Sequence, residues 1–106
     1  MDSYSVRCLF LWKRRPEQKA AHLYEERITL WQATGIEEAL VLAEQEAKVY
    51  SSDGESEFLD FSQAYWLTEP LPASGVEVFS LLRESDLVPS AYIDAFFDSG
   101  AERTRT

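Results

Sequence analysis

The sequence predicts an α+β fold with the element order ββαββα, in which a four-stranded, largely antiparallel sheet carries one long helix on one face and a short helix follows at the C-terminal end. Two observations predict it: four segments alternate with the two-residue period of strands, and one segment repeats apolar residues at three- and four-residue steps. With 45% hydrophobic and 13% aromatic residues, the 106-residue chain has enough apolar surface for one core. We therefore expect a single domain over residues 1–100 and a flexible tail over residues 101–106.

The first two predicted strands form a hairpin. Residues 4–12 alternate, and one side of this strand carries Tyr4, Val6, Cys8, Phe10 and Trp12. Residues 13–21 contain Pro16 and lack apolar alternation, so they predict the connecting loop, because proline has no N–H for a strand ladder. Residues 23–33 alternate again, which completes a long hairpin.

A helix is predicted to begin at Thr34. Thr34 and Glu37 have the T-x-x-E spacing of a capping box, in which each side chain binds a free backbone N–H at the helix start. The apolar stripe that follows consists of Ile36, Ala39, Leu40, Ala43, Ala47 and Tyr50. Its alanines allow close approach, so we expect this helix to pack on the sheet.

Two further strands and a short helix complete the predicted fold. Residues 57–67 and 76–83 alternate, and the turn between them, rich in proline and glycine, favours a second hairpin. Pro89 suits the first turn of a helix that Gly100 ends. Two alternatives remain for the sheet face opposite the long helix. Either a monomer buries all its large apolar residues, or this face exposes some of them and the C-terminal helix, with Phe96 and Phe97, covers part of the face. The residues concerned are Leu9, Leu11, Trp31 or Trp66, depending on the register.

The charge of the chain excludes several classes of partner. Its formal net charge is −9, and residues 28–106 hold fifteen acidic against four basic side chains, whereas residues 1–27 hold four acidic and six basic ones. Such a field repels nucleic acids and anionic lipids, which bind proteins through Lys and Arg. We therefore expect no nucleic acid and no membrane as partners. The sequence shows no long apolar run and no charged start of a signal peptide, so we expect a cytoplasmic protein.

The sequence predicts no enzyme site. Its one histidine, His22, lies at a loop boundary without a Gly-x-Ser-x-Gly elbow, and its one cysteine, Cys8, lies mid-strand, where burial keeps a thiol unreactive. Asp53, Glu55 and Glu57 alternate, but they do not form a calcium loop. The chain has no P-loop and no GxGxxG motif. We expect no catalytic residue, no metal and no cofactor.

Charged residues gather on two of the predicted strands. The run Glu25-Glu26-Arg27 lies on the second strand, and residues 83–86 end the fourth. In an antiparallel sheet these segments can lie side by side, where carboxylates and arginines either form cross-strand ion pairs or do acid–base work and bind an anion. Together with two tryptophans, the candidate binding residues are Glu26, Arg27, Trp31, Trp66, Arg83, Glu84 and Asp86.

Several short motifs resemble a known family. They are Tyr4-Ser5-Val6-Arg7, Tyr24-Glu25-Glu26-Arg27-Ile28, Glu37-Glu38-Ala39, Ala43-Glu44, Glu46-Ala47, Leu82-Arg83-Glu84-Ser85-Asp86-Leu87 and Phe96-Phe97-Asp98. In these motifs, which span nearly the whole chain, the sequence resembles the small bacterial proteins catalogued as domain of unknown function 4288, whereas the loop Lys13-Arg14-Arg15-Pro16 is particular to this chain. The resemblance implies a compact bacterial cytoplasmic α+β domain. It implies no activity and no catalytic residue.

Two hypotheses about function follow from these observations. The first is a non-catalytic, acidic protein-binding module, in its narrower form an immunity-type or antitoxin-type inhibitor of a basic partner, because an acidic surface rich in aromatic residues attracts and binds basic proteins. The second is a homodimeric α+β domain that encloses a small molecule. In one version of this hypothesis the domain is an enzyme that acts through Glu26, Arg27, Arg83 and Glu84.

Overall fold

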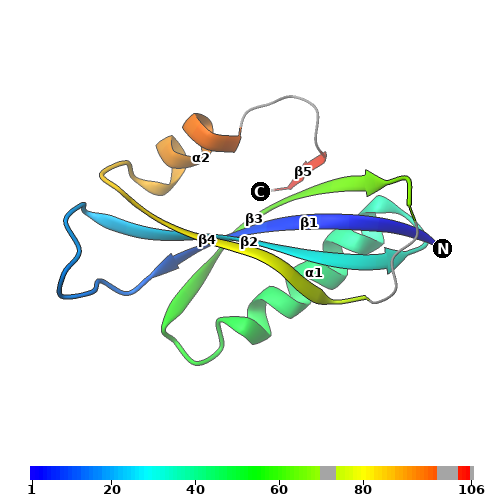
Figure 1. Ribbon diagram of the computed structural model, residues 1–106, viewed down its shortest axis with the longest axis horizontal. Helices are drawn as coiled ribbons and strands as arrows, with labels where there is room; N and C mark the ends of the chain where they lie inside the picture. The colour runs from blue at the N-terminus through cyan, green and yellow to red at the C-terminus, as the bar shows by residue number, and fades with distance from the viewer. Residues whose placement is uncertain (70–73, 98–102, 106) are drawn as a thin grey trace.

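The structure of the protein is a computed structural model, which describes residues 1–69, 74–97 and 103–105. The helices and strands, in chain order, are β1 (Asp2–Trp12), β2 (His22–Ala33), α1 (Ile36–Tyr50), β3 (Ser56–Leu67), β4 (Val76–Ser85), α2 (Pro89–Phe97) and β5 (Arg103–Arg105). The predicted α+β class and the order ββαββα are confirmed. The helices α1 and α2 lie on opposite sides of the sheet (Figure 1).

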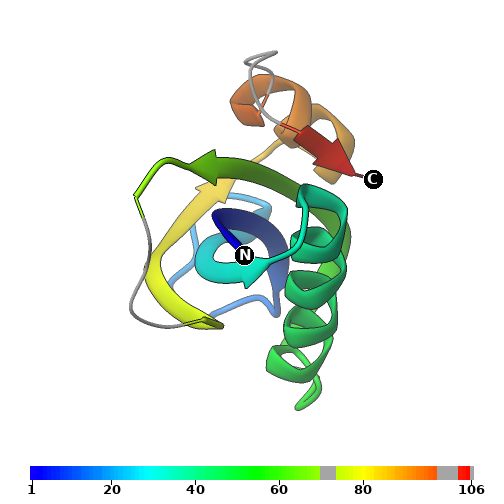
Figure 2. The same ribbon diagram turned by 90° about the vertical axis from the view of Figure 1, so that its right-hand side faces the viewer.

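The strands form one antiparallel sheet in the order β4-β2-β1-β3-β5. Viewed from the end at which the N-terminus lies, the sheet is strongly twisted (Figure 2). β5 pairs with β3, so residues 103–105, which the sequence analysis assigned to a tail, form a short edge strand. The rest of that predicted tail, residues 101, 102 and 106, lies outside the described residues.

The first predicted hairpin is confirmed and the second is wrong. β1 and β2 pair along their whole length, from Asp2 opposite Ala33 to Trp12 opposite Leu23. β3 pairs with β1 and β4 pairs with β2, so β3 and β4 flank the central hairpin on its two sides. This arrangement puts β1, which buries apolar side chains on both faces, in the interior of the sheet, where α1 and α2 cover its two faces.

One core lies between α1 and the sheet. It contains the predicted face of β1, the alanines of α1 and two residues of β3, with members Tyr4, Val6, Cys8, Phe10, Ala33, Ala39, Leu40, Ala43, Ala47, Phe58 and Ala64. The predicted burial of Cys8 and of the α1 alanines is confirmed. The helix stripe reaches the sheet closely because alanine adds little volume at the contact.

The start of α1 differs from the predicted capping box. Gly35 is the N-cap residue, and because glycine has no side chain, it makes no side-chain hydrogen bond to the helix. Thr34, the residue before the N-cap, instead donates its backbone N–H to a carboxylate oxygen of Glu38 at 2.9 Å, so a glutamate of the first turn binds a backbone N–H four residues earlier, one residue beyond the spacing of a capping box. Extended backbone at Gly35 shifts the helix start by one residue, and Glu37 lies in the first turn.

A second core lies between α2 and the other face of the sheet. Tyr92 stacks on Tyr24 with ring centroids 4.0 Å apart, and Phe97 meets Phe61 edge-on at 4.9 Å. Leu9 is the fifth buried member of this core. The prediction that Pro89 begins a helix is confirmed, and so is the partial cover of this face by Phe97. The predicted end of the helix at Gly100 lies outside the described residues.

Candidate functional site

Three consecutive charged residues of β2 are buried. Glu25, Glu26 and Arg27 are only 4%, 5% and 7% exposed. Because side chains alternate along a strand, Glu25 and Arg27 point to the face on which α1 packs and Glu26 points to the face on which α2 packs. The sequence run therefore contributes to two separate polar clusters, one on each face of the sheet.

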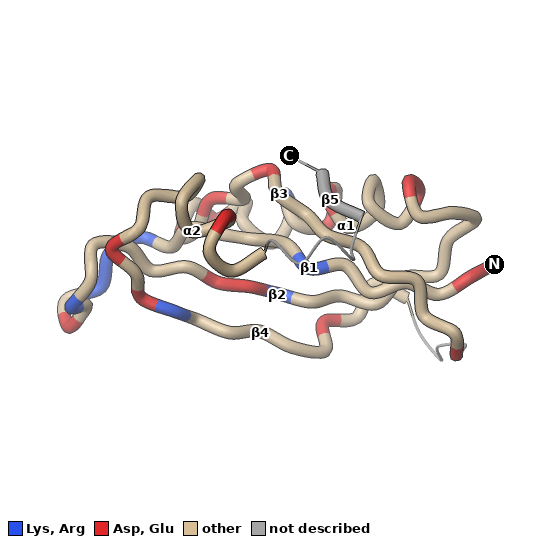
Figure 3. Tube along the Cα trace, turned by 90° about the horizontal axis from the view of Figure 1, so that it is seen from above, with Lys and Arg blue, Asp and Glu red and all other residues tan. Residues whose placement is uncertain are grey.

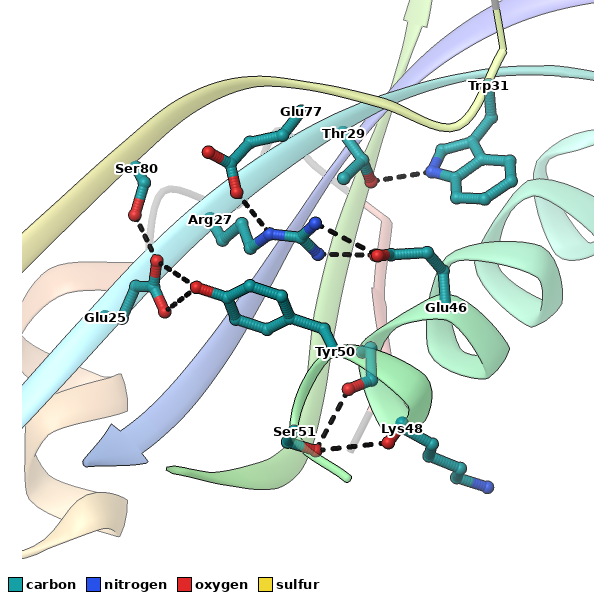
Figure 4. A network of polar contacts seen from close by, with 11 residues as sticks. Glu25, Arg27, Thr29, Trp31, Glu46, Lys48, Tyr50, Ser51, Glu77 and Ser80 are labelled. Carbon is teal, nitrogen blue, oxygen red and sulfur yellow. Dashed lines mark hydrogen bonds and ion pairs between the residues drawn. The ribbon is translucent and has the colours of Figure 1, made fainter. Parts of the chain in front are cut away.

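Arg27 forms the centre of the cluster on the α1 face (Figure 4). Its guanidinium binds both carboxylate oxygens of Glu46 and donates its Nε–H to Glu77 on β4. The ring of Tyr50 lies 3.8 Å below the guanidinium carbon, in a cation–π contact. Burial alone would lower the pKa of Arg27, but the hydrogen bonds to Glu46 and Glu77 raise it, so its positive charge is held firmly in place.

Glu25 belongs to the same cluster, but its partners are neutral donors. Its carboxylate accepts hydrogen bonds from the Trp12 indole at 2.9 Å, from the Tyr50 hydroxyl at 2.9 and 3.0 Å, and from the Ser80 hydroxyl. Within the described part of the chain, no Lys, Arg or His forms an ion pair with Glu25. Burial, together with the hydrogen bond to Glu25, raises the pKa of Tyr50 to about 12, so this tyrosine stays a donor.

The cluster on the α1 face, consisting of Glu25, Arg27, Glu46, Tyr50 and Glu77, therefore carries an excess of negative charge. It contains three carboxylates and one guanidinium, which binds Glu46 and Glu77 but not Glu25, so two formal negative charges are left without a cation. We call this group the α1-face cluster. Its outer members are accessible, because the Glu77 side chain is 40% exposed.

Glu26 forms the centre of the opposite cluster, the α2-face cluster, which also contains Arg7, Gln63, Arg83 and Tyr92. One carboxylate oxygen of Glu26 accepts from the Tyr92 hydroxyl at 2.7 Å and from Arg83 at 3.1 Å, and the other lies 3.6 Å from Arg7. Burial and the hydrogen bond to Glu26 raise the pKa of Tyr92. Two guanidiniums around one carboxylate leave one formal positive charge here.

Arg7 and Gln63 connect this cluster to α2. The Arg7 guanidinium donates to the side-chain oxygen of Gln63, and the Gln63 amide donates to the Phe97 carbonyl at 2.7 Å. The Phe97 ring lies 4.0 Å from the Arg7 guanidinium carbon. These contacts fix the end of α2 over the cluster, so the ion pairs of Glu26 are part of the structure that holds the helix.

Glu84 and Asp86, two more predicted binding residues, hold the loop between β1 and β2. One oxygen of Glu84 accepts the backbone N–H groups of Lys19 and Ala20 at 2.6 and 2.8 Å, and Asp86 accepts that of Ala21 at 2.9 Å. The hydrogen bonds from the Ala20 and Lys19 N–H groups lower the pKa of Glu84. Both carboxylates therefore have a structural role in positioning the loop.

The two tryptophans belong to neither cluster and lie on either side of Tyr4, which pairs with Trp31 on β2 and with Trp66 on β3. Trp31 packs against the α1 core, and its indole donates to the Thr29 hydroxyl at 2.6 Å. Trp66 is exposed on β3 and lines a shallow hollow near the N-terminus. Of the seven predicted binding residues, the structure brings only Glu26 and Arg83 into direct contact with each other.

A set of exposed apolar residues along β4 was not predicted from the sequence. Most of the large apolar side chains of this strand are exposed, and so are further apolar residues of the following turn and of α2. Its members are Val76, Val78, Phe79, Leu82, Leu87, Val88 and Phe96, and we call it the β4 surface. The available sequence signal was that residues 76–82 are apolar on both strand faces, but only the strand order shows that β4 is an edge strand (Figure 3).

The remaining candidates show no site chemistry. Cys8 is buried, and burial raises its pKa to about 12, which suppresses the thiolate. Within residues 1–69, 74–97 and 103–105, no group of three or more His, Cys, Asp or Glu side chains is arranged to hold a metal ion. None of the described helices is long and apolar enough to cross a membrane.

A scan against protein-family models and searches of curated proteins and of solved structures found no match to this chain. The resemblance to domain of unknown function 4288 therefore stays a prediction.

Proposed function

We propose that the protein is a non-catalytic binding module that recognises a basic protein through the β4 surface. The observation that carries this proposal is the gathering of exposed apolar residues on the open edge strand and on the adjoining turn and helix. Exposed apolar side chains that gather on one strand and the elements next to it mark an interaction site, because leaving them in water is unfavourable. An aromatic residue such as Phe79, 51% exposed, is a typical anchor for such an interface.

The net charge of −9 supports a basic partner. An acidic surface attracts a basic protein at long range and speeds their association, and salt weakens this effect by screening. An immunity-type or antitoxin-type inhibitor, which covers a basic active site, is the narrower form of this proposal.

The burial of the charged residues argues against catalysis at the predicted polar constellation. Catalytic acids and bases must reach a substrate, whereas Glu25, Glu26 and Arg27 are buried and bound to side chains of this chain. They fit the structural alternative, cross-strand and helix–sheet pairs.

Affinity capture with two matched valine variants tests the proposal. Val78, on the β4 surface, and Val49, on α1, are 51% and 72% exposed, so lysine is tolerated at both positions. The tagged wild type and Val49→Lys should capture the same stoichiometric basic partner from native lysate, and Val78→Lys should lose it. Raising the salt concentration should slow association. An acidic partner, association indifferent to salt, or equal capture by both variants would contradict the proposal.

One observation favours the second candidate, a domain that binds a small molecule. An open hollow of about 570 Å³ lies beside the end of β4, and its lining is Arg15, Glu17, Gln18, Leu23, Leu82, Arg83 and Glu84. If it holds an anionic small molecule, Arg83→Met should abolish that binding while the protein stays folded. Unfolding of this variant would instead assign Arg83 to its ion pair with Glu26 alone.

A further inference from the structure

We propose that β4 binds its partner by strand addition, and that the added strand alternates apolar residues with Lys or Arg. This inference depends on the proposed function and specifies how the partner is recognised. Strand addition means that an extended segment pairs with the free edge of a sheet through backbone hydrogen bonds, while its side chains provide specificity.

The outer edge of β4 is open for such pairing. β4 is the last strand of the sheet, and among the described residues only β2 pairs with it. Its register with β2 is shifted between Glu77 and Phe79 and regular from there to Ser85, so residues 79–85 offer a regular edge. Proteins usually protect such an edge with proline, lysine or a cover. The strand contains neither proline nor lysine, and its one arginine, Arg83, binds Glu26.

The two faces of this edge have different chemistry. On the α2 face, Phe79 lies opposite Ile28, and the exposed Phe96 ring lies 4.1 Å from the guanidinium carbon of Arg83. An apolar side chain of the added strand would pack there beside Phe79. On the α1 face, Glu77 binds Arg27 and the Ser80 hydroxyl binds Glu25, so this face of the edge borders the α1-face cluster, and Leu82 is its exposed apolar residue, opposite Glu25.

The charge excess of the α1-face cluster selects a cation on that face. Glu77 shares the single guanidinium of Arg27 with Glu46, and it is partly exposed beside the open edge. A Lys or Arg of the added strand would provide the second positive charge that this cluster lacks. The α2-face cluster already carries one positive charge in excess, so the added strand gains nothing from a cation there. Alternation of apolar and basic residues satisfies both faces, because strand side chains alternate between them.

A second copy of the chain fits this edge poorly. Another β4 would bring its own Glu77 and Glu84 to a border that is already acidic, while its Arg83 remains bound to Glu26. Like charges on neighbouring strands are destabilising. The charge pattern therefore favours a basic strand over self-pairing.

Two synthetic peptides of equal length and composition test the inference. One repeats Val-Lys, which separates valine and lysine onto two strand faces, and the other repeats Val-Val-Lys-Lys, which mixes them. We expect the alternating peptide to bind at least about ten-fold more tightly, a difference of about 1.4 kcal/mol. It should also slow hydrogen exchange of backbone amides within residues 79–85.

Valine variants and the captured partner separate failure of this inference from failure of the proposed function. Val78→Lys should weaken the alternating peptide about ten-fold, whereas Val49→Lys should leave its affinity unchanged. Equal binding of both peptides, slowed exchange outside β4, or a wild-type dimer that pairs through β4 would overturn strand addition. Val78→Lys could abolish capture of a basic partner that does not slow hydrogen exchange on the β4 edge of the wild type. That result would overturn strand addition, but it would still support the proposed binding module. An acidic partner would overturn both.

Discussion

Glu25 and Glu26 are chemically identical neighbours, both almost fully buried, yet they occupy opposite electrostatic environments. On the α1 face, Glu25 is held by neutral donors in a cluster with two negative charges in excess. On the α2 face, Glu26 lies between two arginines. The difference shows that burial alone does not determine the role of a carboxylate. Glu26 neutralises part of the positive charge of Arg7 and Arg83, whereas Glu25 adds to an excess of negative charge beside the open edge of β4.

The largest effect should come from removing the single cation of the α1 face. Arg27→Met leaves Glu46 and Glu77 without their guanidinium, and breaking a buried pair from one side costs about 3–5 kcal/mol. Arg83→Met should cost only about 1–2 kcal/mol, because Arg7 still faces Glu26 and the Arg83 side chain is partly exposed. Urea unfolding of both variants measures the difference. Equal losses would contradict the unequal distribution of cations between the faces.

A smaller effect should come from the hydroxyl that binds Glu25. Tyr50→Phe should cost about 1 kcal/mol at neutral pH, because Glu25 keeps Trp12 and Ser80 as donors. Burial and the hydrogen bond to Glu25 raise the pKa of Tyr50 from 10.0 to about 12 in the folded protein. The stability that Tyr50 contributes is therefore complete below pH 10 and is lost as the pH rises from 10 to about 12. The variant should therefore lose less stability over this interval, measured by thermal unfolding at each pH. A loss parallel to that of the wild type would show that Tyr50 does not titrate as described.

Local patterns predicted the parts of the fold that depend on neighbouring residues. The burial of β1, the hairpin with β2 and the alanine stripe of α1 follow from periodicity over a few residues. The partners of β3 and β4 depend on long-range pairing, and alternation in a strand is the same whichever neighbour it has, so the predicted second hairpin was wrong.

The candidate site, like the fold, was predicted from the sequence only in its local features. The contact of Glu26 with Arg83 follows from antiparallel strands with opposite charges at nearby positions. Alternation alone separates Arg27 from Glu26, but which of the two lies beside Arg83 depends on register, because a shift of one residue would exchange the faces. The exposure of Phe79 could not be predicted, because it requires knowing that β4 lies at the edge.

The most direct test of the account is the difference in unfolding free energy between Glu25→Gln and Glu26→Gln, measured by urea denaturation. The glutamine at position 25 can still pair with the hydroxyls of Tyr50 and Ser80 and removes one excess negative charge, so this variant should lie within about 1 kcal/mol of the wild type. Glu26→Gln removes the carboxylate between Arg7 and Arg83 and should be destabilised by about 2–4 kcal/mol. Equal losses, or a larger loss for Glu25→Gln, would contradict the charge asymmetry on which the proposed alternation of apolar and basic residues in the added strand depends.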